Sequence, residues 1–359
     1  MFSIGALDTE PLPHDMQAGS ILAIADDLTG ALEAGAKFAS NGLSATVVTG
    51  LESPIQANST VLVIDAETRH RTPLESAVCV KEFVSKARNS SLQLIYKKTD
   101  STLRGNIAAE LRAIQDLFPG RRFIYVPAYP EMGRTVEDGE LFVWGTRVHE
   151  TEFAHDRWHP VRDCKIRSVL GDVDALITDG KSNADIDTAV QTILAEPAPP
   201  LCAGPAALAE ALARHFGRPT DFHLPETPRF LVVNGSMHPA SGQQIDVARR
   251  AALFNDDWIH FSDAIPGVGL ERALKLGESV RRKLQSSSLN TLVVFGGDTA
   301  FGVHQALGSP PFRSQGEILP GVPLSESCGL HWITKAGGFG DPDLLLAIRD
   351  KFVAARRTT

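Results

Sequence analysis

The chain has 359 residues, of which 43% are hydrophobic and 22% charged, a length beyond the usual limit for one hydrophobic core. Its 35 Lys and Arg residues against 43 Asp and Glu residues give a formal net charge of −8 without long runs of one sign, which disfavours a nucleic-acid or anionic-membrane partner. We therefore expect two domains, in which local cations must meet any anionic substrate.

Cysteine usage and the N-terminal segment bear on the cellular compartment. The four cysteines lie far apart and form no C-x-x-C pair, which suits a reducing cytoplasm better than a disulfide or zinc framework. Residues 1–19 lack the basic and apolar segments of a secretory signal, and no later apolar run reaches membrane-spanning length. The sequence predicts a cytoplasmic protein with a flexible N-terminus at residues 1–19.

Apolar runs alternate with helical patterns from residue 20 to residue 217, as is typical of a mostly parallel, doubly wound sheet. The predicted strands are 21–25, 46–49, 61–65, 92–97, 123–126 and 175–178, and the predicted helices are 29–40, 74–88, 106–118, 184–195 and 206–216. The alternation loosens at 127–160, where we expect hairpins or functional loops.

Residues 218–228 contain three prolines and no periodicity, so this segment is the best linker candidate. Beyond it we predict strands at 230–233 and 291–295 and helices at 243–253 and 269–284. We expect an α/β protein with domains at 20–217 and 229–359, each a mostly parallel sheet flanked by helices, and an active site in the cleft between them.

The first chemically informative turn, Ala-Asp-Asp-Leu-Thr-Gly-Ala at 25–31, follows the first predicted strand, at the strand end where open α/β sheets bind ligands. One of its two carboxylates, Asp26 or Asp27, can cap the next helix, which is a purely structural role. Because consecutive side chains diverge, the other can face a crevice and accept a hydroxyl proton or hydrogen bonds. The turn alone leaves both roles open.

A second turn, at 97–106, also joins a predicted strand to a predicted helix. Its polar and charged side chains include Lys98, Asp100, Ser101 and Arg104. Two lysines and an arginine around such a turn suit the capture of a carboxylate, because Arg presents a planar fork of donors and Lys a movable charge. Solvated surface charge with a Ser/Thr cap is the alternative. Arg69 and Arg134 add weaker signals at the same sheet end, where either could instead pair with a nearby carboxylate.

Glycine-rich turns follow two strands of the C-terminal half. They read Phe-Gly-Gly-Asp-Thr-Ala at 295–300 and Lys-Ala-Gly-Gly-Phe-Gly-Asp at 335–341, and their glycines can bring backbone N–H groups close to phosphate oxygens. The negative charge of Asp298 does not suit an anion site unless the residue caps the helix or acts on phosphate through bound Mg²⁺. Ser236, after another predicted strand, can close the same pocket. Either segment could be a glycine turn without a binding role, but two such turns in one domain favour a site that surrounds a nucleotide.

Three further patterns do not meet the requirements of the sites that they imitate. Gly180-Lys181-Ser182 resembles the end of a phosphate loop but lacks its first glycine, and the segment 267–269 lacks the third glycine of a dinucleotide fingerprint. The histidines at 149, 155 and 159 are spaced too irregularly for a helical metal site, so only a loop site stays open as an alternative.

Taken together and in this order, the segments resemble the four-carbon acid sugar kinase family, which includes threonate, erythronate and 3-oxo-tetronate kinases. The matching segments are 25–31, 98–106, 127–135, 150–156, 296–300, 320–323 and 335–340, which span nearly the full length. The chain is shorter than is usual for the family. It also departs from the family pattern at 237–242, at Glu140 and Trp144, and at 162–164.

The resemblance implies an N-terminal domain that binds the sugar acid and a C-terminal domain that binds ATP. The residues expected to hold the sugar acid are Asp26, Asp27, Arg69, Lys98, Asp100, Ser101, Arg104 and Arg134. Those expected to hold ATP are Ser236, Gly296, Gly297, Asp298, Thr299, Lys335, Gly337 and Gly338. Asp27 is our hypothesis for the group that accepts the proton of the attacking hydroxyl.

We expect in-line phosphoryl transfer with Mg²⁺, in which positioning and charge neutralisation dominate, and domain closure through the 218–228 linker that excludes water. A non-catalytic sensor of sugar acids or nucleotides is one alternative. An oxidoreductase with a nucleotide fold is another, against which the missing dinucleotide fingerprint stands. The identity of the sugar acid, the hydroxyl that is phosphorylated, the metal ligands and the oligomeric state are left open.

Overall fold

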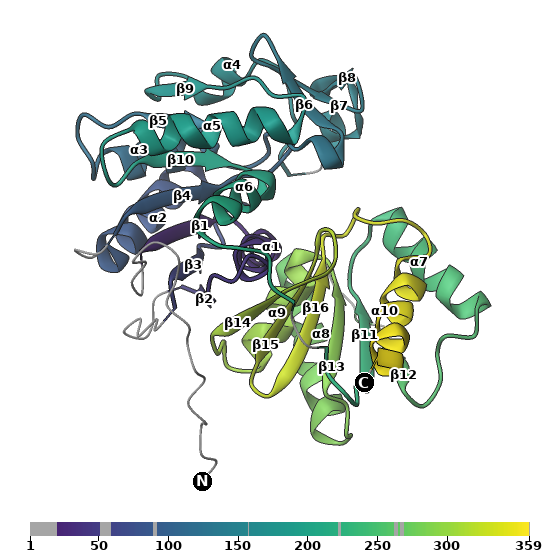
Figure 1. Ribbon diagram of the computed structural model, residues 1–359. Helices are drawn as coiled ribbons and strands as arrows, with labels where there is room; N and C mark the ends of the chain where they lie inside the picture. Colours follow the sequence, from purple (N-terminus) through teal and green to yellow (C-terminus); the bar gives the residue numbers. More distant parts are fainter. Residues whose placement is uncertain are drawn as a thin grey trace.

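The computed structural model describes residues 20–50, 59–88, 92–156, 158–221, 224–261, 265 and 269–358. The molecule has an α/β architecture of two lobes, in which helices flank a large sheet (Figure 1). The predictions for residues 1–19 and for part of the 218–228 linker fall outside the described residues. None of the helices in the described ranges is long and apolar enough to cross a bilayer.

The N-terminal half forms the upper lobe of Figure 1, and the strands of its main sheet pair with one another in parallel. Its strands are β1 (Ile21–Ala25), β2 (Ala45–Thr49), β3 (Val61–Asp65), β4 (Leu94–Lys98), β5 (Phe123–Tyr125), β9 (Ala175–Ile177) and β10 (Leu201–Gly204). Its helices are α1 (Leu28–Ala39), α2 (Pro73–Ala87), α3 (Ile107–Gln115), α4 (Ile166–Leu170), α5 (Asn183–Ala195) and α6 (Ala206–Phe216). This half confirms the predicted doubly wound sheet.

A small antiparallel sheet occupies the stretch where the sequence predicted hairpins or loops. It consists of β6 (Arg134–Glu137), β7 (Glu140–Val143) and β8 (Thr146–Arg147), followed by short 3₁₀ turns at Val148–Glu150 and Glu152–His155. These segments carry Arg134 and Phe153 towards the ends of the main strands, where both line the pocket described below.

The C-terminal half forms the lower lobe of Figure 1 and mixes parallel with antiparallel strands. Its strands are β11 (Phe230–Asn234), β12 (Trp258–Phe261), β13 (Thr291–Phe295), β14 (Phe312–Leu319), β15 (Val322–Ser327) and β16 (Leu330–Lys335). Its helices are α7 (Pro239–Arg250), α8 (Gly269–Gln285), α9 (Gly297–Ala306) and α10 (Leu344–Thr358). Helix α7 begins earlier than predicted, because His238 caps it and Pro239 occupies its first turn.

The two lobes share one sheet, which the sequence did not indicate. The strand order is β12-β11-β13-β16-β15-β14-β2-β3-β1-β4-β10-β5-β9, and β14 pairs with β2 in antiparallel register, Phe312 opposite Val47. One hydrophobic cluster continues across this junction and includes Val47, Phe312 and Trp332. We call this junction of β2, β14 and the α1 helix beside them the seam.

Strand register explains how the functional turns come together. In the N-terminal half, Ala25 lies opposite Asp65, and Ile24 lies opposite Lys97, so the turns that follow β1, β3 and β4 emerge side by side. In the C-terminal half, Phe295 lies between Asn234 and Lys335, which places the turns after β11, β13 and β16 together. Because each set leaves the carboxyl ends of parallel strands, each is placed where such sheets bind ligands.

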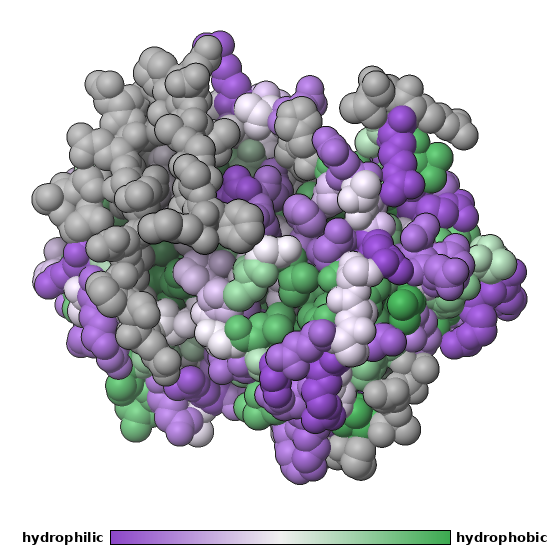
Figure 2. Space-filling view, turned by 90° about the horizontal axis from the view of Figure 1, so that it is seen from below, coloured by the Kyte–Doolittle hydropathy of each residue, from purple (hydrophilic) through white to green (hydrophobic). Residues whose placement is uncertain are grey.

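The face seen from below in Figure 2 carries mostly hydrophilic side chains, with hydrophobic ones gathered near its centre.

Candidate active site

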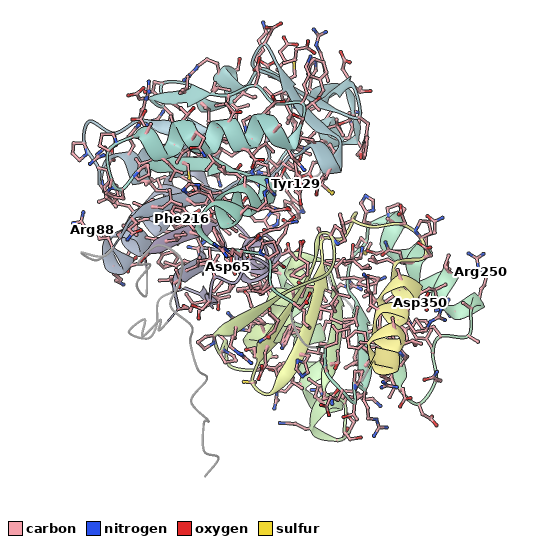
Figure 3. The ribbon with its side chains drawn as sticks, viewed as in Figure 1. Asp65, Arg88, Tyr129, Phe216, Arg250 and Asp350 are labelled. Carbon is pink, nitrogen blue, oxygen red and sulfur yellow. The ribbon has the colours of Figure 1, made fainter. Side chains whose placement is uncertain are left out.

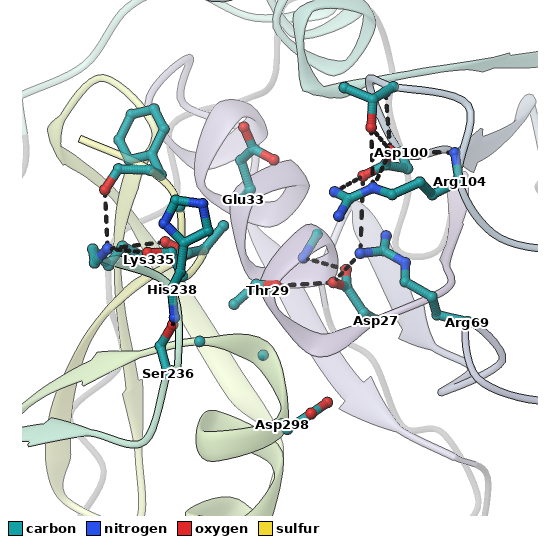
Figure 4. A pocket seen from close by; sticks show the side chains of 18 of the residues that line it. Asp27, Thr29, Glu33, Arg69, Asp100, Arg104, Ser236, His238, Asp298 and Lys335 are labelled. Atoms are coloured by element: carbon teal, nitrogen blue, oxygen red, sulfur yellow. Dashed lines mark hydrogen bonds and ion pairs between the residues drawn. The ribbon is translucent and has the colours of Figure 1, made fainter. Parts of the chain in front are cut away.

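A pocket of about 600 Å³ receives side chains from both halves of the protein (Figure 4). It brings together every predicted site residue except Asp26. Those from the N-terminal half are Asp27, Arg69, Lys98, Asp100, Ser101, Arg104 and Arg134, and those from the C-terminal half are Ser236, Gly296, Gly297, Asp298, Thr299, Lys335, Gly337 and Gly338. Tyr129 also lines the pocket, and Figure 3 shows it on the side of the N-terminal lobe that faces the C-terminal lobe.

Asp26 lies behind the pocket and holds Arg69. Its side chain is buried, and its two carboxylate oxygens accept hydrogen bonds from Nε and Nη2 of Arg69, both at 2.8 Å. Burial alone would raise the pKa of Asp26, but the charge of Arg69, reinforced by Lys97 and Lys98, lowers it to about 2. This bidentate pair occupies both carboxylate oxygens of Asp26 and orients Arg69, while the contact of Asp26 with substrate stays a prediction.

Asp27 combines the two roles that the sequence left open. Its Oδ1 accepts a hydrogen bond from the Gly30 N–H at 2.8 Å and so caps helix α1. Its Oδ2 accepts from the Thr29 hydroxyl at 3.0 Å and from Nη1 of Arg69 at 2.7 Å, while the carboxylate still lines the pocket. Three donors thus fix the orientation of Asp27, as Figure 4 shows.

The turn after β4 is organised around Asp100. This carboxylate accepts hydrogen bonds from Nε and Nη2 of Arg104 at 3.0 and 2.8 Å and from the Thr102 N–H at 2.9 Å. Although burial opposes it, the charges of Arg104 and Arg69 hold the pKa of Asp100 well below its usual range. Arg104 also pairs with Asp156 at 3.2 Å, so its charge is largely compensated within the protein.

Arg134 differs from the other cations of the N-terminal half. Among the described residues, Arg69, Lys98 and Arg104 each have a carboxylate within 4 Å, whereas no carboxylate lies so close to Arg134. Its Nε is buried without a hydrogen-bond partner, its Nη1 donates to the Met132 carbonyl, and its guanidinium lies 5.9 Å from the ring centre of Phe153. Among the described Lys and Arg residues of this half that line the pocket, Arg134 is therefore the one whose charge is not paired with a carboxylate.

Two carboxyl groups near Asp27 were not predicted: Asp65 is buried, whereas Glu67 is half-buried and lines the pocket. Glu67 accepts a hydrogen bond from the Leu28 N–H at 3.2 Å, and its own N–H donates to Asp65. Burial and the nearby charge of Asp27 raise the pKa of Glu67 to about 8, and burial with the charge of Glu67 raises the pKa of Asp65 well above its usual value. The left-handed backbone of Glu67, at φ +46°, is the kind of local strain that clusters at functional sites.

His70 reaches from one half of the protein towards the other. Its Nε2 lies 3.7 Å from Oδ1 of Asp298 in the first turn of α9, and its ring stacks on that of His159 at 5.5 Å between centres. Within the described part of the chain, no group of three or more His, Cys, Asp or Glu side chains is arranged to hold a metal ion.

The glycine turns of the C-terminal half form a tight cradle. A Cβ atom at Gly337 would collide with Oγ of Ser236, and one at Gly338 would come within 3.0 Å of Nε2 of His238. Gly296 has φ +96°, a conformation that side chains rarely adopt. Glycine is therefore required for the backbone to approach the pocket as closely as it does.

The N-termini of helices α1 and α9 face each other across the pocket. The Cβ position of Gly297, the first residue of α9, lies 3.2 Å from Oγ1 of Thr29 and 3.6 Å from Oδ2 of Asp27. The α1 end is already capped, because the N–H groups of Leu28 and Gly30 donate to Glu67 and Asp27. The α9 end has no side-chain cap, so its N–H groups and the positive end of its dipole can face an anion.

Lys335 holds the second glycine turn together from within. Its ammonium donates to the carbonyls of Ala336, Gly337 and Phe339 and to the Ser241 hydroxyl, at 2.9 to 3.2 Å. Burial lowers the pKa of Lys335 to about 7. The donors of Lys335 thus shape the turn that lines the pocket, and its predicted contact with ATP stays a prediction.

Arg272 of helix α8 also lines the pocket and was missed in the sequence. It donates to the carbonyls of Gly235 and Ile265 at 2.7 and 3.2 Å, and no carboxylate among the described residues lies within 4 Å of it. No motif marks this position, because it lies among the many charges of an amphipathic helix.

Comparison with known proteins gives the family. A model of a sugar-binding N-terminal domain matches residues 21–174, and a model of a nucleotide-binding C-terminal domain matches residues 262–345. The D-threonate kinase of Salmonella typhimurium LT2 is 28% identical over 90% of this chain and 96% of that protein. The 3-oxo-tetronate kinase of Pectobacterium atrosepticum is 25% identical over 92% of this chain and 99% of that protein.

This chain belongs to the four-carbon acid sugar kinase family. A member named D-erythronate kinase, from Heliobacterium modesticaldum, is 30% identical over 42% of this chain and 35% of its own length. The sugar-binding model of this acid sugar kinase family covers the turns with Asp27, Arg69, Arg104 and Arg134, and the nucleotide-binding model covers both glycine turns.

Solved structures share the fold of this acid sugar kinase family member. A Salmonella typhimurium LT2 protein described as a tRNA synthase has a TM-score of 0.74 at 20% identity, covering 92% of this chain and 99% of that one. A domain of unknown function from Bordetella bronchiseptica, crystallised with bound citrate as a domain-swapped dimer, has a TM-score of 0.52 at 26% identity, covering 92% and 98%.

Proposed function

We propose that this protein is an ATP-dependent kinase that phosphorylates a hydroxyl group of a small sugar acid of about four carbons, in the pocket between its two halves. The observation that carries the proposal is that one pocket joins the cationic turns of the sugar-binding half to the glycine turns of the nucleotide-binding half. The uncapped N-terminus of α9, which lies opposite Asp27 and Thr29, offers a place for the phosphoryl group that passes between the two halves.

The sugar-acid end is assigned to the N-terminal half. Arg134, the described pocket cation of this half with no carboxylate within 4 Å, would hold the substrate carboxylate, because a planar guanidinium suits such an ion. Asp27 would accept the proton of the attacking hydroxyl, and Arg69, fixed by Asp26, would keep Asp27 in place. Relatives named for D-threonate, 3-oxo-tetronate and D-erythronate, and a neighbour crystallised with the hydroxy acid citrate, support a small hydroxy acid as substrate.

The nucleotide end is assigned to the C-terminal half. Its residues fit ATP, because the Gly337-Gly338 cradle, the N-terminus of α9 at Gly297 and the Arg272 guanidinium could surround a polyphosphate chain. Mg²⁺ in such reactions is held mainly by phosphates and water with one or two carboxylates, and it neutralises phosphate charge when bound. Asp298 is the carboxylate of this half that is placed for that role.

The division of the chain supports this assignment. The two family models lie on either side of the 218–228 segment, so we keep 20–217 and 229–359 as the two domains and 218–228 as the linker between them. Closure of the domains on substrate would exclude water from the transferred phosphoryl group. We place the protein in the cytoplasm on the basis of its cysteine usage.

A substrate panel tests the proposal. ADP release is measured with Mg-ATP and four-carbon hydroxy and oxo acids, including D-threonate, D-erythronate and 3-oxo-tetronate. Turnover of at least one acid is expected. Tight binding of acid or ATP without any turnover would support the sensor alternative and overturn the kinase.

A variant tests the role of Asp27. Asp27→Asn should lower kcat by on the order of 100-fold or more while the protein stays folded, because the proton acceptor is lost. Asp116→Asn, which removes an exposed carboxylate paired with Lys81, is the matched control and should leave kcat unchanged. Full activity of Asp27→Asn would exclude Asp27 as the base.

A further inference from the structure

Helix α1 belongs structurally to both halves of the protein. Its N-terminus carries Asp27 into the pocket, and its later turns lie on β14 of the C-terminal half. A Cβ atom at Gly35 would collide with Oγ of Ser314 and lie 2.9 Å from Val47 of β2, so the absence of a side chain lets helix and strand approach closely. Any group that links the end of α1 to β14 therefore links the two ends of the pocket.

Glu317 of β14 makes such a link with both carboxylate oxygens and its backbone N–H. Its Oε2 lies 2.8 Å from Nζ of Lys37 in α1, and its backbone N–H donates to the Ser40 hydroxyl at 3.2 Å. Its Oε1 accepts a hydrogen bond from the N–H of Gly321 at 2.9 Å. One carboxylate thus joins helix α1 to the turn between β14 and β15.

The ion pair between Lys37 and Glu317 is buried enough to hold helix α1 and strand β14 in one arrangement. The side chain of Lys37 is 4% exposed and that of Glu317 is 12% exposed. Burial alone would lower the pKa of Lys37, but Glu317 and Glu210 raise it above its usual value, so the lysine stays charged. A buried pair with satisfied hydrogen bonds holds its partners in one arrangement more firmly than an exposed pair does.

The β14–β15 turn forms a wall of the nucleotide end. Gly321 and Phe339 both line the pocket, and Gly321 has φ +72°. A Cβ atom at Gly321 would lie 2.5 Å from the Phe339 ring, so the two are in tight contact. Phe339 belongs to the same glycine turn as Gly337 and supplies one of the carbonyls that hold Lys335.

We propose that Glu317 is a positioning residue for the nucleotide end of the pocket, and this inference rests on the proposed kinase function. Through Lys37 and the Gly321 N–H, Glu317 holds the β14–β15 turn and Phe339 at a fixed distance from helix α1. The cradle for ATP is thereby placed relative to Asp27 by a contact that touches neither substrate.

The protein contains a matched control for this proposal. Lys37 also pairs with Glu210 of α6 at 2.8 Å, within the N-terminal half, so Glu210→Ala and Glu317→Ala each remove one carboxylate from the same ammonium. Only Glu317→Ala disconnects the turn at Gly321. If Glu317 merely stabilises the fold, the two variants should behave alike.

Steady-state kinetics and ATP binding by calorimetry are measured for wild type and both variants. Loss of a hydrogen bond to a charged group and of the ion pair should raise KM and Kd for ATP about tenfold in Glu317→Ala, with KM for the sugar acid changed less than about twofold. Glu210→Ala should leave both KM values within about twofold of wild type. Glu317→Gln, which can still accept from Gly321, should recover part of the ATP affinity.

Two results would overturn the inference while leaving the kinase proposal intact: equal ATP constants in Glu210→Ala and Glu317→Ala, or a Glu317→Ala defect shared equally by ATP and the sugar acid. Gly321→Ala, which pushes against Phe339 without touching the ion pair, provides the second route and should reproduce the ATP-specific defect. Normal ATP affinity in Gly321→Ala would also overturn it. Absence of turnover in wild type would instead refute the proposed function.

Discussion

The buried imidazole of His304 should make the stability of this protein depend on pH by an amount that follows from its surroundings. The ring is fully buried, stacks on Phe312 with 4.4 Å between ring centres, and lies 2.7 Å from the Pro310 carbonyl through Nε2. Since a carbonyl only accepts, Nε2 carries the proton of the neutral ring, and Nδ1 faces the Thr49 hydroxyl at 3.5 Å across the seam. Burial lowers the pKa of His304 from 6.5 to about 4, although the Pro310 carbonyl opposes the shift.

The sign follows from proton binding. Between pH 6.5 and pH 4 the unfolded chain binds a proton at His304 that the folded chain does not, so the free energy of unfolding falls as the pH falls through this window. Above pH 6.5 both states are neutral there and the effect disappears. At about 1.4 kcal/mol per pKa unit, the loss reaches about 3 kcal/mol at pH 4.

Urea unfolding of wild type and His304→Gln between pH 7 and pH 4 measures this loss. Tryptophan fluorescence is a suitable signal, because the ring centre of Trp332 lies 6.2 Å from that of His304. The stability of wild type relative to the variant should fall by about 3 kcal/mol over this range, since the contributions of other groups cancel in the difference. His155→Gln, at an exposed position, is the control and should show no such trend. A constant difference between wild type and His304→Gln would refute the reasoning.

Three further substitutions test packing and the two ends of the pocket. Gly302→Ala should lower the free energy of unfolding by about 1–3 kcal/mol, because its Cβ would collide with the Ala273 carbonyl where α8 meets α9. Gly242→Ala, in open space on α7, should instead raise the free energy of unfolding by about 0.5–1 kcal/mol. Equal effects of the two substitutions in urea unfolding would contradict this packing. Arg134→Met should raise KM for the sugar acid about tenfold or more without changing KM for ATP in steady-state assays, and a rise shared by both constants would count against a carboxylate anchor. Lys335→Met should weaken ATP binding about tenfold in calorimetry, because the turn loses its internal donor; unaltered affinity would show that the turn keeps its shape without the ammonium.

The sequence predicted the elements whose signals are local. Strand β1 is a fully buried apolar run, and helix α1 begins at a capping aspartate, so both were visible from residue types alone. Strand β14 was not predicted, because its buried positions include Ser314 and Gly316, so the sequence does not show the apolar alternation of a half-buried strand. Its pairing with β2 joins Val47 to Phe312, positions too distant in the chain for any local pattern to connect.

In the candidate site, too, local signals were predicted and contacts between distant residues were not. The turns with Asp27, Arg104 and Gly297 were found because glycine, hydroxyl and charged residues crowd at strand ends, and the structure brings them to one pocket. The contacts of Asp26 and Lys335 within the protein could not be predicted, because they depend on which donors and acceptors lie nearby after folding. Asp26 is occupied by Arg69, and the Lys335 ammonium by the carbonyls of its own turn.

The seam also protects an edge. Without β14, strand β2 would be the last strand of the N-terminal sheet, and its unpaired N–H and C=O groups would be open to another chain. The buried Lys37 would lose Glu317, its partner across the seam. The 218–228 segment is therefore a poor place to truncate the protein: either half produced alone should aggregate through its exposed strand, and co-expression of the two halves should restore a soluble pair.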